Sequence, residues 1–367
     1  MSIKMERANF IFEGTLVAEQ PLATCSATLN EAHGGKGKPM PIPFISTPQG
    51  RRLMFPATGI RGKLRRALRD VLRNKVIEKT GNLKPLSLDE HYLLTLGGIK
   101  GKGNTDRSTV AMEAEWRERN VLLSLFGAGD AGVLGFMQGR LSVGNAICNE
   151  VSQPVIFSGA RTDDLYRNKE QVSFLSDDDV RSLIARSKGN RDASVVKRDL
   201  AAREKELKTS QKAKDTETTE RLAAEVAGLK NEIEAIKAES GAGDNSVGMP
   251  LAGWEAIPIG ACMDHRFMLS NATDVELGAI LAALGEFSVM PVLGAHFAAG
   301  CGLVSGEWEV FKVQSGKGKV SLGKVLLKPF ECAPVIEAPS TSELFSATEA
   351  FSSYLSSDVL NLSMPRA

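Results

Sequence analysis

Three arginines repeat at helical spacing between residues 55 and 73, in the sequence FPATGIRGKLRRALRDVLR. Arg61, Arg65 and Arg69 are four residues apart, which places them in one row on a helix. Beside this row, apolar residues recur at the spacing of a buried stripe: Ile60, Leu64, Leu68, Val71 and Leu72. A row of guanidinium groups next to a buried stripe predicts a helix that binds a polyanion.

Neighbouring residues favour the same chemistry. Further cations widen the basic side of the helix: Lys63, Arg66 and Arg73. Thr58 is predicted to cap the first turn. Gly59 and Gly62 would let the backbone come close to a ligand, so that free N–H groups at the helix start hold a phosphate.

The charge of this segment differs from that of the whole chain. Between Arg51 and Lys75 there are nine Lys or Arg residues and one acid, Asp70, whereas the 367-residue chain has a net charge of +1. A basic helix face is often only solvated. Charge concentrated on one element of a nearly neutral protein creates a directed field, which favours recruitment of a phosphate backbone.

Several other kinds of site are not expected. Five cysteines are widely scattered without a CxxC pair, and four histidines form no HxxxH or HxxE pair, so we predict neither disulfides nor a metal site. Gly127, Gly129 and Gly132 match GxGxxG, but a helix precedes them and strand formers follow, the reverse of a dinucleotide-binding loop. We therefore predict no cofactor. No apolar run is long enough to span a membrane and no signal peptide is apparent, so we expect a cytoplasmic protein.

The elements that must position the basic helix follow in chain order. The pattern predicts an opening strand near residues 8–18, a long Gly- and Pro-rich loop at 31–52 containing Lys36 and Lys38, and a second helix at 112–126. Thr273 and Glu276 predict a capping box, and the helix it starts leads into a glycine-rich loop and an alternating strand. Strands and helices mixed in this order predict an α+β fold.

Composition divides the chain. Residues 191–240 have no proline and no aromatic residue, and Leu222, Val226, Leu229, Ile233 and Ile236 keep a heptad spacing. We therefore expect 1–190 to be the first part of the core, 191–247 a helical hairpin with a flexible return, 248–338 the second part of the core, and 339–367 a C-terminal tail. Because the charges of the hairpin are mixed in sign, a surface insertion or protein contact is preferred for it over RNA binding.

The sequence resembles the backbone subunits of CRISPR effector complexes, members of the RAMP superfamily. The resemblance lies in FEGTLVAEQPLATCSATL followed by FPATGIRGKLRRALRD, in SLFG then GRLSVGNA, and in ELGAILAAL followed by GAHFAAGCGLVSG. It implies a ferredoxin-like, RRM-like RAMP core with a thumb, between about residues 157 and 259, that kinks RNA. It also implies partners: a guide RNA (crRNA), further copies packed head to tail, other CRISPR subunits, and target DNA or RNA paired with the guide.

The same resemblance assigns residues to RNA. Thr58, Gly59, Arg61, Lys63 and Arg65 would hold guide phosphates. Met249 and Trp254 would wedge against bases, and other candidates in the basic helix, the long loop and the glycine-rich loop complete the set: Arg66, Arg69, Lys36, Lys38, His296 and Gly300. Reversing the charges of Arg61 and Arg65 together is expected to weaken RNA binding.

One departure from the family concerns catalysis. Type III relatives cleave target RNA with an Asp in the loop before the basic helix, and that position falls near Met40 here, with no Asp between Glu31 and Arg52. We therefore expect a subunit that binds without cutting and is not an enzyme, most like the type IV version. The alternative is a metal-dependent endoribonuclease that uses His33 with Glu31 as an acid/base pair. A third possibility, a nucleotide-dependent enzyme built on residues 127–132, is disfavoured by its structural context.

Overall fold

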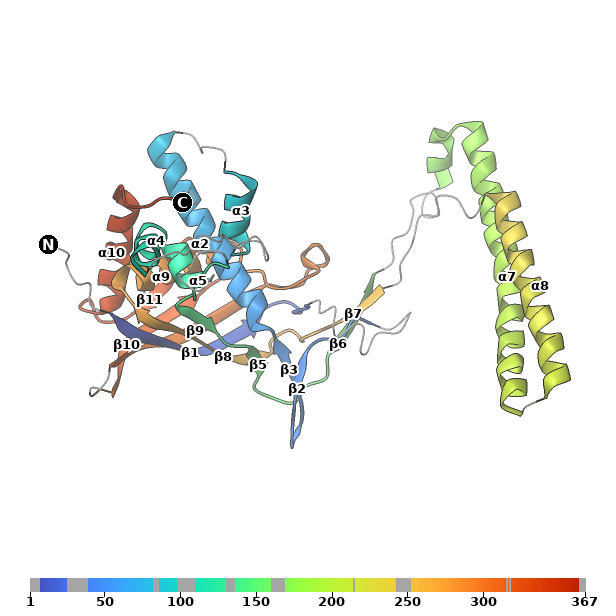
Figure 1. Ribbon diagram of the computed structural model, residues 1–367, viewed down its shortest axis with the longest axis horizontal. Coiled ribbons are helices and arrows are strands. Elements are labelled where there is room, and N and C mark those ends of the chain that lie inside the picture. Colours follow the sequence, from blue (N-terminus) through green and yellow to red (C-terminus); the bar gives the residue numbers. More distant parts are fainter. Residues whose placement is uncertain are drawn as a thin grey trace. The chain divides into compact units, whose positions relative to one another are not determined.

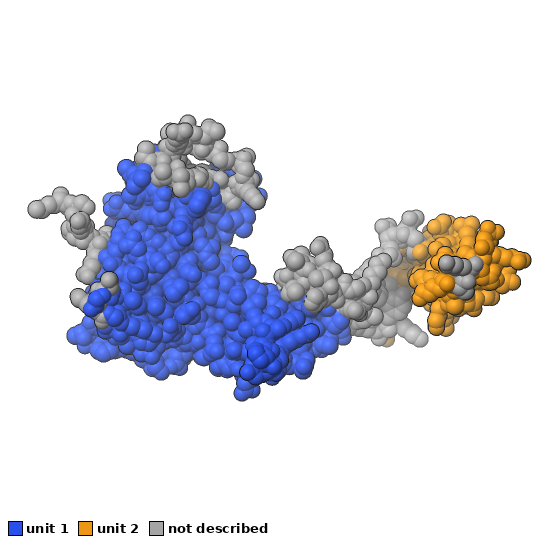
Figure 2. Space-filling model, turned by 60° about the horizontal axis from the view of Figure 1, so that its bottom comes forward, with its two compact units in different colours: residues 1–158, 252–367 blue, residues 159–251 orange. Residues whose placement is uncertain are grey.

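The computed structural model describes residues 7–24, 39–81, 86–97, 110–129, 136–159, 169–213, 215–241, 252–314, 316 and 318–362. The chain forms two compact units, one of residues 1–158 with 252–367 and one of residues 159–251 (Figure 2). Helices combine with antiparallel strands, so the predicted α+β class is confirmed.

A large antiparallel sheet forms the first unit, with strands in the order β11-β10-β9-β1-β8-β5-β3-β2 and β4 beside β8. The strands span these residues: β1 (Ala8–Ala18), β2 (Phe44–Thr47), β3 (Gly50–Phe55), β4 (Leu141–Val143), β5 (Ala146–Cys148), β8 (Cys262–Ala272), β9 (Val304–Gln314), β10 (Gly318–Leu327) and β11 (Val335–Glu337). A smaller sheet pairs β6 (Val155–Gly159) with β7 (Ala252–Ala256). The predicted opening strand is β1, which lies inside the sheet between β8 and β9.

Helices cover one face of the large sheet (Figure 1). They are α2 (Ala57–Thr80), α3 (Leu88–Thr95), α4 (Val110–Arg119), α5 (Val121–Phe126), α9 (Asp274–Val289) and α10 (Glu343–Ser356). Helix α9 packs against α2, α5 and α10. In the part of the chain that the structure describes, no helix has the length and apolarity needed to cross a bilayer.

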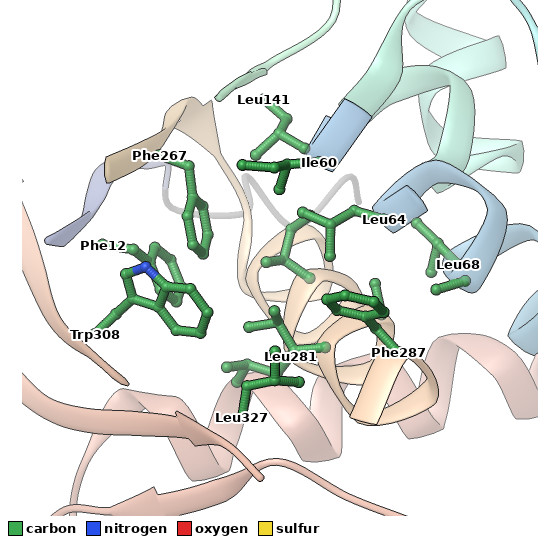
Figure 3. Close-up of a cluster of buried hydrophobic side chains, with 14 of the residues drawn as sticks. Phe12, Ile60, Leu64, Leu68, Leu141, Phe267, Leu281, Phe287, Trp308 and Leu327 are labelled. Carbon is green, nitrogen blue, oxygen red and sulfur yellow. The ribbon is translucent and has the colours of Figure 1, made fainter. Parts of the chain in front are cut away.

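The core lies between the helices and the covered face of the sheet. Figure 3 shows Ile60, Leu64 and Leu68 of α2 directed toward side chains of β1, β8, β9 and α9. The rings of Phe12 and Phe267 stack with their centroids 4.2 Å apart, and Trp308 meets Phe267 edge-on. The apolar stripe predicted from the sequence is therefore the surface that fixes α2 to the sheet.

Side chains cap the starts of α9 and α5, the first of them as predicted. Thr273 accepts a hydrogen bond from the Glu276 N–H and the Glu276 carboxylate accepts from the Thr273 N–H, so the predicted capping box of α9 is confirmed. The helix predicted at 112–126 is divided into α4 and α5, because the Asn120 side chain caps a new helix by accepting from the Leu123 N–H.

Three segments contain more regular structure than the sequence indicated. The predicted loop at 31–52 contains the hairpin β2–β3, whose turn ends at Gly50 with φ 136°. Helix α3, in a segment for which the sequence analysis named no element, starts with a capping box of Ser87 and Glu90. The C-terminal tail contains α10, which packs on α9: a Cβ added at Gly278 would lie 2.1 Å from the Ala347 carbonyl oxygen.

The second unit is built on two long helices, α7 (Asp177–Ala213) and α8 (Thr216–Ser240). Helix α7 begins well before residue 191, where composition placed the start of the hairpin, and the Ser176 hydroxyl accepts from the Asp179 N–H at its first turn. Leu222, Val226 and Ile233 are the buried residues of α8. The heptad spacing therefore describes the seam between the two helices.

Candidate nucleic-acid interface

The start of α2 is exposed, but it is capped differently from the prediction. Pro56 occupies the N-cap position and makes no side-chain cap, and Thr58 lies inside the first turn, so the predicted capping by Thr58 is wrong. The Asn145 Oδ1 instead accepts from the Ala57 N–H at 2.8 Å. Thr58 and Gly59 are exposed, which leaves this first turn accessible to a ligand.

The glycine-rich loop lies next to this turn through one aromatic ring. A Cβ added at Gly59 would lie 2.8 Å from the Phe55 ring, and one added at Gly294 would lie 3.1 Å from the same ring. Gly294 has φ 79°, and its added Cβ would also lie 1.9 Å from the Ala23 carbonyl oxygen. Glycine is therefore required at Gly59 and Gly294 by packing, whatever the ligand.

Arg65 is not on the surface. It is 4% exposed, and its guanidinium donates to the carbonyl oxygens of Leu93 and Leu94 at 2.7 and 2.9 Å. It also donates to those of Phe126 and Gly127, each at 3.3 Å. All five N–H donors therefore serve the ends of α3 and α5. Burial, with a smaller contribution from Arg61, lowers the pKa of Arg65 to about 10. In this arrangement Arg65 has no donor left for a phosphate.

The other two arginines of the row have partners within the protein. Arg61 is partly buried; its Nη2 donates to the Phe126 carbonyl oxygen at 2.6 Å, and burial lowers its pKa. Arg69 donates to both carboxylate oxygens of Asp70, at 2.9 and 3.1 Å. The row that the sequence predicted as one phosphate-binding face therefore points mostly at the protein's own carbonyl and carboxylate groups.

Two cations of α2 are better placed for an external anion. Arg66 is exposed, and Lys63 is partly buried with its Nζ 5.8 Å from the centroid of the Phe287 ring; among the described residues neither has an ion-pair partner. A Cβ added at Gly62 would lie 3.8 Å from the Arg66 Nη1, so the Arg66 side chain turns back toward the second turn of the helix. Burial, followed by the charge of Arg66, lowers the pKa of Lys63, with Asp70 opposing. A phosphate at this turn would relieve the repulsion between the two cations.

Trp254 and His296, predicted from separate parts of the sequence, are in contact. Their rings stack with centroids 4.0 Å apart, and the Phe157 ring extends the stack from Trp254 at 6.0 Å. His296 adopts the left-handed conformation with φ 62°, which is uncommon for a residue other than glycine. Gly300, with φ 74°, ends the short 3-10 helix η2 (Phe297–Ala299) that follows His296. The sequence did not indicate Phe157, which belongs to β6.

Met40 lies beside this stack. Its N–H donates to the Gly253 carbonyl oxygen and its carbonyl oxygen accepts from the Glu255 N–H, both at 2.8 Å. The neighbouring carboxylate of Glu255 accepts from the Ile42 N–H at 3.0 Å. The backbone at Met40, the position to which the sequence resemblance assigned the catalytic Asp of type III proteins, is therefore held against β7.

Several predicted residues lie outside the described residues: Lys36, Lys38, Met249, Glu31 and His33. Within the described residues, no group of three or more His, Cys, Asp or Glu side chains is arranged to hold a metal ion.

The uncovered face of the large sheet differs in chemistry from the start of α2. Its charged residues pair with each other across the strands: Glu13 with Arg266 and Lys319, and Glu307 with Lys324. A sheet that binds single-stranded RNA presents aromatic rings on which bases stack. The uncovered face therefore presents paired charges, and its Phe311 ring is covered by the Lys319 ammonium at 3.7 Å.

Comparison with known proteins gave matches among solved structures. No protein family model matches the chain, and no curated protein matches it. Among solved structures, it is similar to a chain of a Type IV-B CRISPR complex, with 12% sequence identity and a TM-score of 0.42. The similarity covers 84% of this chain and 91% of that chain.

Proposed function

We propose that this protein is a guide-RNA-binding subunit of a CRISPR effector complex. The observation that carries the proposal is the surface formed by the first turns of α2 and the glycine-rich loop. Lys63 and Arg66 offer unpaired charge there, Thr58 and Gly59 offer an accessible helix start, and the Trp254–His296 stack borders the loop. Cations would bind the phosphates and an aromatic surface would contact bases, which together suit single-stranded RNA.

The order of elements supports a ferredoxin-like core of the RAMP type. Two βαβ-like halves follow one another, β1–α2–β5 and β8–α9–β9, and the four strands lie in the order β9-β1-β8-β5. This is a β-α-β-β-α-β arrangement with both helices on one face. The resemblance of the FPATGIRGKLRRALRD segment to RAMP proteins points to the same core. Copies would pack head to tail along the guide and leave its bases free to pair with target nucleic acid.

We further propose that the subunit binds RNA without cutting it. A catalytic carboxylate at the position of Met40 would organise a metal ion or a proton transfer at the scissile phosphate. Methionine supplies neither an acid nor a base. Glu255, the nearest carboxylate along β7, accepts a backbone hydrogen bond and so has a structural role.

Reversing the two unpaired charges of α2 tests the proposed function. We expect Lys63→Glu with Arg66→Glu to weaken binding of a labelled single-stranded RNA about 10- to 100-fold, for every sequence tried, because two phosphate contacts become repulsive. The slope of log K against log salt should fall by about 1.4, which is two phosphates at about 0.7 each. Fluorescence anisotropy over a range of salt concentrations measures both quantities.

The matched control lies on the same helix. Lys75→Glu with Lys79→Glu makes the same change of net charge near the C-terminal end of α2, where Lys75 pairs with Glu78 and Lys79 donates to the Ser357 carbonyl oxygen. This variant should bind RNA within about twofold of the parent. Equal losses in the two variants would show a general charge effect, and unchanged binding by the first variant would refute the α2 site.

A further inference from the structure

The outer face of α7 carries a row of cations that the proposed function does not use. The α7 row is defined by these side chains, all exposed: Arg181, Lys188, Arg191, Arg198, Lys205, Lys208 and Lys212. Leu200 and Leu207 face the other way, since they alternate with the row at the heptad spacing of the seam with α8. At about 1.5 Å per residue the row is about 46 Å long.

The cations of the row are largely free of partners. Within the described part of the hairpin, Arg181 is the one member of the row with an ion pair, to Asp178 at 3.5 Å, and both of those side chains are largely exposed. By contrast, charges directed at α8 are paired between the helices: Arg203 with Glu225 at 3.3 Å, and Glu204 with Lys230 at 3.2 Å. The overall charge balance of the hairpin, which disfavoured nucleic acid on sequence grounds, therefore conceals a segregation of charge by face.

A solvated face does not require this pattern. Lys188 and Arg191, Lys205 and Lys208, and Lys208 and Lys212 are like charges three or four residues apart. Each such pair destabilises a helix by about 0.2–0.5 kcal/mol. Acids four residues from two of these cations, Asp192 from Lys188 and Glu204 from Lys208, offset only part of this cost. A polyanion bound along the row would replace this repulsion between cations with attraction to the phosphates.

We propose that the α7 row binds the phosphate backbone of double-stranded DNA. Residues 177–240 contain no aromatic residue, so the hairpin has no platform for the unstacked bases of a single strand. In a duplex the bases are already stacked and only the backbone needs to be bound. This site lies entirely within the second unit and does not rest on the guide-RNA site at α2.

The shape of the row favours DNA over an RNA duplex. The major groove of B-form DNA, about 12 Å wide, admits an α-helix, whereas that of A-form RNA is deep and narrow. Since the row is longer than the groove is wide, cations on either side of the crossing would reach the flanking phosphates. Ile184 and Val195 are exposed by 62% and 56% in the same row, where apolar side chains can contact thymine methyl groups.

Charge reversal on the row tests the proposal in the full-length protein. We expect Arg191→Glu, Arg198→Glu and Lys205→Glu together to weaken binding of a labelled 30-base-pair DNA duplex at least tenfold. The salt slope should fall by about three, at about 0.9 for each phosphate that is no longer neutralised. The matched control, Lys197→Glu with Arg221→Glu and Lys237→Glu, changes the charge equally off the row and should bind the duplex within about twofold of the parent. Circular dichroism of both triple variants checks that the hairpin remains helical.

The outcomes separate the two proposed sites. A row variant that binds the duplex as the control does would overturn the α7 site. An RNA duplex or a single strand bound more tightly than DNA, with the row variant weakening that binding equally, would overturn the assignment to double-stranded DNA. The Lys63→Glu/Arg66→Glu protein should keep its duplex binding. The test of the α7 row can therefore be interpreted even if the α2 proposal fails.

Discussion

Replacing Arg65 with methionine is expected to lower the free energy of unfolding by about 3–5 kcal/mol. The change removes five hydrogen bonds at once. The carbonyl oxygens of Leu94 and Gly127 then have no donor among the described residues, whereas that of Phe126 keeps Arg61 and that of Leu93 keeps the Gly97 N–H. Unsatisfied buried carbonyl groups cost about 1–3 kcal/mol each, partly offset by water that enters the site. Urea unfolding followed by circular dichroism measures the loss.

The adjacent arginine provides the control. Arg66→Met makes the same substitution at the next residue. Because Arg66 is exposed, the free energy of unfolding of this variant should differ from that of the parent protein by no more than about 0.5 kcal/mol. Arg66→Met should nevertheless weaken RNA binding, although its fold is intact. Equal stability of the two variants would contradict the role assigned to Arg65. For the same reason, charge reversal at Arg61 and Arg65 together would report on unfolding and would not isolate RNA binding.

Acidification is expected to destabilise the protein through His265. This histidine of β8 is 3% exposed, and its Nδ1 accepts from the Trp308 indole N–H at 3.1 Å. Burial lowers its pKa from 6.5 to about 4. Because the unfolded state binds this proton more readily, stability is lost as the pH falls below 6.5. The loss should be about 2 kcal/mol between pH 7 and pH 5 and about 3 kcal/mol by pH 4.

The test compares pH profiles, because carboxylates titrate in the same range. His265→Asn keeps an acceptor near the position of Nδ1 but does not titrate. Its stability should be lower at pH 7, from the smaller side chain, and should fall less steeply toward pH 4 than that of the parent protein. Denaturant unfolding at several pH values gives both curves. Parallel curves would show that His265 makes no contribution to the pH dependence.

The sequence predicted the basic helix and its buried stripe, but not which of its arginines are buried and which are exposed. Arg65 is one position beyond Leu64, so spacing assigns it to the flank of the stripe. Its burial depends on the ends of α3 and α5, which are distant in the sequence and whose open carbonyl groups require donors. Local periodicity contains no information about such partners. It correctly predicted the helix and misled about which cations face outward.

The Trp254–His296 contact is likewise formed by residues that are distant in the sequence. The resemblance to RAMP proteins placed both residues near RNA for separate reasons, and the structure shows their rings stacked. The sequence did not indicate Phe157, the third ring, because β6 and β7 pair although the residues of the second unit separate them in the sequence. The capping box of α9 was predictable because both of its residues belong to one turn. Caps and stripes are local signals, whereas composite surfaces are not.

The place of β1 in the sheet has a consequence for biosynthesis. Its hydrogen-bonding partners are β8 and β9, so β1 is made about 250 to 300 residues before the strands that pair with it. At about 5–20 residues per second, a ribosome needs roughly 15 to 60 seconds to supply them. During that interval the backbone of β1 has neither of its neighbouring strands to pair with, while the α7–α8 hairpin, whose contacts are local, is completed. The unpaired edges of β1 are therefore exposed for longer during synthesis than the seam between α7 and α8.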